Sequence, residues 1–100
     1  MRKNKAKTKT ELKKLINDWA QEIKVTPKQI RVQQMKHKWA SCSTSGWISF
    51  NFDLLSKSKK FQDYVIIHEL LHLQIPNHGK LFKSMMNIFF PDWEKYESSF

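Results

Sequence analysis

The residues best suited to chemistry in this sequence are His68, Glu69, His72 and His78. His68 and His72 are four residues apart, so a helix would project both imidazoles from one face, where they could bind one metal ion. Zinc is the usual ion for such a pair. Glu69 could reach a water molecule beside the ion, and His78 would supply a third ligand. Three protein ligands leave a position open for water or substrate, as in catalytic zinc sites, so the pattern predicts a zinc hydrolase.

The sequence around this motif supports a metal site over a chance match. The preceding residues 64–67 are apolar, which predicts a helix that is buried nearly all round. Buried histidine and glutamate side chains without partners would be costly, and a metal ion removes that cost. Pro76 and Asn77 predict a turn directly after Ile75, which would bring His78 back toward the other two histidines.

Length and composition indicate one small cytoplasmic domain. The chain has 100 residues, enough for a single domain with a modest core. Its one cysteine, Cys42, excludes an intramolecular disulfide and a cysteine-based zinc ribbon, and it fits a reducing compartment. The basic N-terminus lacks the apolar segment of a secretory signal, and no apolar run approaches the ~20 residues needed to cross a membrane. We therefore expect a cytoplasmic protein without a membrane segment.

Positive charge is concentrated at the N-terminus. The net charge is +9, and residues 1–14 hold seven Lys or Arg residues against one acid, Glu11. We expect residues 1–8 to form a disordered basic arm. Such an arm could bind nucleic acid by neutralising phosphates, or it could be a solvated tail that keeps the protein soluble. The sequence leaves both interpretations open, and it does not define an oligomeric state.

Apolar periodicity predicts a single α+β domain over residues 9–100. Apolar positions at three- and four-residue steps predict helices, and alternation of apolar and polar residues predicts strands. The two predicted strands are separated by a turn-rich segment and would pair as a small antiparallel sheet. The expected helices cover residues 9–24, 59–73, 79–90 and 92–100, and the expected strands cover residues 30–35 and 47–52.

Two blocks of the sequence resemble a known family. Residues 38–43 and 46–51 are similar to the tryptophan- and serine-containing signature of YgjP-like metallopeptidases, and residues 68–78 are similar to the metal-binding block of that family. Residues 78–82 also resemble the element that carries the third ligand in SprT-like zinc proteins. The resemblance extends over residues 30–95.

This resemblance implies a minimal zincin, with an N-terminal helix, a small antiparallel sheet, an active-site helix and a following helix that carries the third ligand. It implies that His68, His72 and His78 hold Zn²⁺ and that Glu69 is the general base of peptide-bond hydrolysis. A protein or peptide would be the substrate, and the SprT-like relatives suggest proteins associated with nucleic acid.

Several residues outside the motif have a candidate role. Peptide hydrolysis needs a second electrophilic partner for the carbonyl oxygen, and the sequence offers His37, Asn51 and Tyr64 without singling one out. Cys42 could be a fourth ligand or a redox switch, although the role of a small apolar side chain is favoured. Residues 47–51 are the candidate edge strand for pairing with an extended substrate.

Two other functions are compatible with the sequence. One is a metal-dependent hydrolase of nucleotides or other phosphoesters, because a positive surface could bind phosphates. The other is a non-catalytic, metal-stabilised DNA-binding module, which would leave Glu69 without a role. We prefer the zinc metallopeptidase because it uses the glutamate and the open coordination position together.

Overall fold

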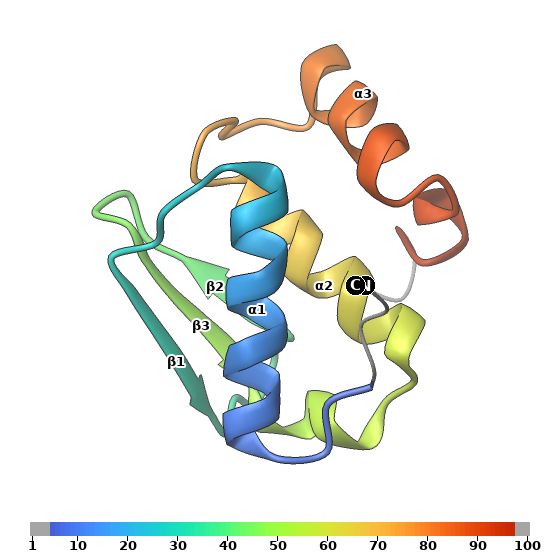
Figure 1. The fold of residues 1–100 in the computed structure, drawn as a ribbon. Helices are drawn as coiled ribbons and strands as arrows, with labels where there is room; N and C mark the ends of the chain where they lie inside the picture. Colours follow the sequence, from blue (N-terminus) through green and yellow to red (C-terminus); the bar gives the residue numbers. More distant parts are fainter. Residues whose placement is uncertain (1–4, 98–100) are drawn as a thin grey trace.

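The computed structural model describes residues 5–97, which form an α+β fold and confirm the predicted fold class. Each predicted helix and strand overlaps an observed element, while the short strand β2 was not predicted. No helix within the described part has the length and apolar character needed to span a membrane. The elements are α1 Lys9–Ile23, β1 Gln29–Gln33, β2 Ala40–Cys42, β3 Trp47–Asn51, η1 Phe52–Ser56, α2 Lys59–Leu71, α3 Lys80–Phe89 and η2 Trp93–Lys95 (Figure 1).

The strands form one mixed sheet instead of the predicted antiparallel one. Their order is β1-β3-β2, and the central strand β3 pairs parallel with β1 and antiparallel with β2. The antiparallel pairing predicted for residues 30–35 and 47–52 is therefore wrong, because the segment between them contributes its own strand. The chain reverses before β2 and again at a turn where Gly46 has a φ of 94°, so β3 runs in the same direction as β1.

Helices cover one face of the sheet, and the other face is exposed (Figure 1). Helix α1 packs against β1, α2 packs against β2, and the two helices contact each other. Val32, Ile48 and Phe50 point into this layer and are buried. On the open face, the guanidinium carbon of Arg31 lies 4.7 Å from the ring centroid of Trp47. Buried and exposed side chains alternate along the strands, so one face of the sheet is apolar and packs on the helices. Helix α2 therefore lies in the interior of the molecule.

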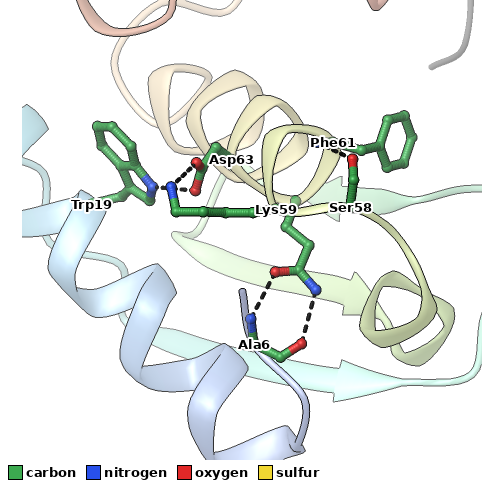
Figure 2. A network of polar contacts seen from close by, with 7 residues as sticks. Ala6, Trp19, Ser58, Lys59, Phe61 and Asp63 are labelled. Atoms are coloured by element: carbon green, nitrogen blue, oxygen red, sulfur yellow. Dashed lines mark hydrogen bonds and ion pairs between the residues drawn. The ribbon is translucent and has the colours of Figure 1, made fainter. Parts of the chain in front are cut away.

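The segment before α1 is docked on the domain. Ala6 is 2% exposed. Its N–H donates to Oε1 of Gln62 over 2.9 Å, and its carbonyl oxygen accepts from Nε2 of Gln62 over 3.0 Å (Figure 2). We expected disorder over residues 1–8; residues 1–4 lie outside the described part of the chain, and for residues 5–8 the expectation is wrong. The reason is a buried glutamine whose amide binds this backbone as a neighbouring strand would.

Helix α2 is buried on nearly all sides, as its apolar sequence predicted. The carboxylate of Asp63 accepts from the indole N–H of Trp19 over 2.9 Å and forms an ion pair with Lys59 (Figure 2). Buried polar side chains in the first half of the helix thus have partners from other elements. His68 and Glu69 are the buried polar side chains of its second half.

Helix α3 extends away from the two layers and packs mainly on α2 (Figure 1). Phe82 and Met86 are buried on the side that faces α2. The helix predicted over residues 92–100 is reduced to the 3₁₀ helix η2 within the described residues. There the indole N–H of Trp93 donates to Oδ1 of Asn87 over 2.7 Å, which ties η2 to α3.

Candidate metal centre

Three histidines from α2 and the turn before α3 converge at one point. His68 lies near the end of α2, His72 is the C-cap residue of that helix, and His78 precedes α3. Their candidate ligand atoms all lie within 4.8 Å of one another. The ring centroids are 4.8 Å apart for His68 and His72, and 4.7 Å apart for His72 and His78. The structure thus brings together the three residues that the sequence predicted as ligands.

Hydrogen bonding orients His72 for metal binding. Its Nδ1 lies 3.0 Å from the carbonyl oxygen of Ile75; since a carbonyl only accepts, Nδ1 carries the proton and Nε2 keeps a lone pair. Nε2 of His72 lies 2.9 Å from Nε2 of His78. Two ligand atoms of a tetrahedral zinc ion are ~3.3 Å apart, given Zn–N distances of about 2.0–2.1 Å. The separation of these two nitrogens is therefore close to that of two ligands of one metal ion.

A tight turn returns His78 to the end of α2. Oδ1 of Asn77 accepts from the N–H of Gly79 over 3.0 Å. A Cβ at Gly79 would lie only 3.0 Å from that oxygen, so the missing side chain leaves room for the turn. Partial burial, followed by the neighbouring His72 and His68, lowers the pKa of His78. The neutral imidazole, which is the form that binds metal, is therefore favoured to a lower pH than in free histidine.

Glu69 lies beside His68. Its side chain is buried, and Oε2 is 3.3 Å from Nδ1 of His68. The group of possible ligands in the described residues consists of the three histidines without this carboxylate. Burial and then the charge of Glu69 raise the pKa of the Cys42 thiol. From its position beside His68, the Glu69 carboxylate could accept a proton from a water molecule at the centre.

Phe82, in the first turn of α3, contacts all three histidines. Its ring is stacked on that of His72, with a centroid distance of 4.8 Å and an interplanar angle of 20°. The centroid also lies 5.3 Å from His68 and 4.8 Å from His78. Sequence reasoning assigned Phe82 to a core-facing helix and missed this role. The signal in the sequence that could have predicted this contact is that Phe82 follows His78 by four residues.

Comparison with known proteins shows the family to which this chain belongs. The sequence matches the family model of the YgjP-like metallopeptidase domain over residues 2–100. The chain belongs to the YgjP-like family. It is therefore a metallopeptidase domain, which acts on protein or peptide substrates with the help of a metal ion. No curated protein matches the chain.

Two solved structures share the fold of this YgjP-like domain. One is the crystal structure of the metallopeptidase zymogen of Methanocaldococcus jannaschii jannalysin, with a TM-score of 0.78 and 24% identity over 88% of this chain and 91% of that chain. The other is the metallopeptidase zymogen of Pyrococcus abyssi abylysin, with a TM-score of 0.72 and 22% identity over 84% of this chain and 85% of that chain. Both confirm the α+β architecture.

Of the three candidate partners for a substrate carbonyl, the one beside the centre is Tyr64. The amide of Asn51 is used to bind the backbone of residues 35–38, and His37 is exposed in the loop before β2. The ring centroid of Tyr64 lies 5.8 Å from that of His68. Burial, followed by two nearby carboxylates, raises the pKa of Tyr64 to about 12. The phenol is therefore a neutral donor at physiological pH.

Cys42 lies outside the group of histidine ligands. It is half-buried on β2, and its thiol donates weakly to the carbonyl oxygen of Ser43 over 3.7 Å. Its raised pKa keeps it a neutral thiol, whereas zinc binds the thiolate. Among the described residues, the group that could hold a metal ion thus consists of the three histidines.

Proposed function

We propose that this metallopeptidase domain uses Zn²⁺ held by His68, His72 and His78, with Glu69 as the general base. The observation that carries the proposal is the convergence of three histidines, whose candidate ligand atoms lie within 4.8 Å of one another, with the Glu69 carboxylate beside His68. Imidazole nitrogens are common ligands of catalytic zinc, and three of them leave the open position that catalysis requires.

The side chains around the centre have distinct roles in hydrolysis. A bound zinc ion would activate a water molecule and polarise the scissile carbonyl. Glu69, held in a buried position beside His68, would take a proton from the water and pass it to the leaving amine. Tyr64 would donate a hydrogen bond to the carbonyl oxygen as negative charge develops on it.

The free edge of β2 is the proposed site for an extended substrate. The edge predicted at residues 47–51 is wrong, because β3 is the central strand of the sheet. The Trp39 carbonyl and the Ser43 N–H bond to β3, so the alternation of an antiparallel ladder turns the backbone groups of Ala40 and Cys42 outward. A peptide could pair with this edge and extend past the metal centre.

A matched pair of glutamate variants tests the proposal. We expect Glu69→Gln to retain stoichiometric zinc and to lose peptide cleavage by at least about 100-fold, the usual scale for a general base. Glu94→Gln, at an exposed position of η2, should change neither zinc content nor activity. Zinc is measured by elemental analysis, and cleavage is measured on casein and on a quenched peptide.

The results of these assays also distinguish peptide hydrolysis from the two alternative functions. Family membership favours peptide hydrolysis over phosphoester hydrolysis and over a non-catalytic DNA-binding module. Nucleoside triphosphate hydrolysis lost in Glu69→Gln, without cleavage of any peptide, would contradict the proposal. Zinc retained at full occupancy after replacement of both His72 and His78 by alanine would contradict the ligand assignment.

Two further expectations concern location and partners. The unpaired Cys42 supports a cytoplasmic location, which cell fractionation would test. The net charge of +9 supports protein substrates that are associated with nucleic acid. Binding to a DNA duplex that weakens steeply with salt would agree with this, and no binding at low salt would contradict it.

A further inference from the structure

An apolar pocket adjoins the metal centre, between α2, α3 and η2. Its volume is about 260 Å³. Because two of the three histidines line it, any group in the pocket would lie beside the bond attacked at the centre. Its main walls are Tyr64, His68, His78, Phe82, Met86 and Trp93.

The size of the pocket suits one large side chain. An apolar cavity of about 150 Å³ is enough to hold a benzene ring, whereas pockets for whole drug-sized ligands are about 300–1,000 Å³. The volume of about 260 Å³ lies between these values. It therefore matches a phenyl or indole ring, or a long aliphatic chain, and is larger than an alanine or glycine could fill.

The lining of the pocket favours an apolar occupant. Phe82, Met86 and Trp93 are all less than 10% exposed, and the thioether of Met86 can adapt to the shape of a ring. The Trp93 N–H is already bonded within the protein, so the indole presents carbon atoms to the pocket. The charged lining residues, Lys83 and Glu97, are exposed, which places them at the mouth. A charged occupant would lose its hydration at the inner wall.

We propose that this pocket receives a bulky apolar side chain of the substrate, from the residue next to the scissile bond. The preference rests on the proposed function, since it assumes that cleavage occurs at the adjoining histidines. It makes the domain a peptidase selective for sites beside phenylalanine, tryptophan, leucine or methionine.

A peptide series tests the preference on the wild-type zinc-loaded protein. The peptides share one sequence and differ at a single internal position, which is Phe, Trp, Leu, Ala, Gly, Glu or Lys. We expect kcat/KM for the Phe and Leu peptides to exceed that for Gly by roughly 10- to 100-fold, with cleavage next to the varied residue. Equal cleavage of all peptides would overturn the preference alone. Cleavage of none would overturn the proposed function and the preference together.

A matched pair of methionine variants locates the preference in the pocket. Met86→Phe adds a ring to the inner wall, and we expect it to lower kcat/KM for the Trp peptide about tenfold relative to the Ala peptide. Met85→Phe makes the same change at the next residue of α3, which is not part of the lining, and should leave the ratio unchanged. An equal effect of both variants would overturn the assignment.

Binding can be measured without metal or activity. We expect N-acetylphenylalaninamide to shift the methyl NMR resonance of Met86 in the metal-free protein, with a smaller shift at Met85 and none with N-acetylglycinamide. Absence of a selective shift would overturn the proposal. This measurement uses the wild-type chain, so it decides the question even if Met86→Phe fails to fold.

Discussion

The imidazole of His72 is held from two sides, by the Ile75 carbonyl at its Nδ1 and by the Phe82 ring stacked on its face. The first contact selects the tautomer, and the second fixes the plane of the ring. Phe82 also touches the other two histidines. We therefore expect the affinity for metal to depend also on residues that donate nothing to the ion.

Replacement of Phe82 by leucine should weaken zinc binding by roughly 10- to 100-fold, the range seen when residues around metal ligands are changed. Leucine keeps an apolar side chain but has no ring face for the histidines. Phe89→Leu, on the same helix but without such contacts, is the control. Competition with a chelator measures the affinity, and equal affinities of the two variants would refute a role for the Phe82 ring.

Tyr64→Phe should lower kcat on the order of 100-fold, with little change in KM, if the hydroxyl stabilises charge that develops only in the transition state. Zinc content should be unchanged. With a pKa of about 12 for Tyr64, the phenol is protonated below that pH, so its contribution should persist at pH 9 and be lost only in strong alkali. A rise in KM at constant kcat would instead indicate simple substrate contact.

At the scale of elements, α2 connects the metal centre to the rest of the fold. Its second half carries His68 and Glu69, and its first half is bonded to the segment before α1 and to α1 itself. Gln62 is fully buried, and its amide also donates to the Leu54 carbonyl over 2.8 Å. One side chain therefore joins α2, η1 and the N-terminal segment.

Gln62→Ala should reduce the free energy of unfolding by about 2–3 kcal/mol, because it leaves buried backbone groups of Ala6 and Leu54 without partners. This is a large share of the ~5–15 kcal/mol that stabilises a typical domain. Gln21→Ala, at an exposed position of α1, should cost less than about 0.5 kcal/mol. Urea denaturation measures both, and similar midpoints would refute the role of the Gln62 amide.

At the scale of the whole molecule, the histidines join two parts that otherwise share a limited interface. Helix α3 packs mainly on α2 and extends away from the sheet (Figure 1). His68 lies in α2 and His72 is the C-cap residue of that helix, while His78 belongs to the turn that leads into α3. A metal ion held by all three would therefore cross-link these parts.

Removal of the metal should destabilise α3 more than α1. A ligand that binds only the folded state stabilises it by about 4 kcal/mol at a thousand times its Kd, and here that energy is applied at the junction of α2 and α3. We expect chelation to lower the melting temperature and to speed hydrogen exchange of residues 78–89 more than of residues 12–20. A uniform increase along the chain would contradict a local cross-link.

The sequence by itself determined the part of the centre that is local. Two histidines four residues apart share a helix face whatever the rest of the fold does, and Pro76 with Asn77 predicts the turn that returns His78. The apolar residues around them predicted a buried helix because periodicity is set by helix geometry. These features follow from backbone rules that act over a few residues.

Tertiary structure alone decided which distant residues meet. The strands were found from their alternation, but their parallel pairing depends on β2, whose three residues carry too little pattern to be recognised. The docking of Ala6 on Gln62 and the contacts of Phe82 with His68 and His72 are contacts between separate elements. Such contacts are selected by packing of the whole core, because each side chain has many possible partners until the elements are placed.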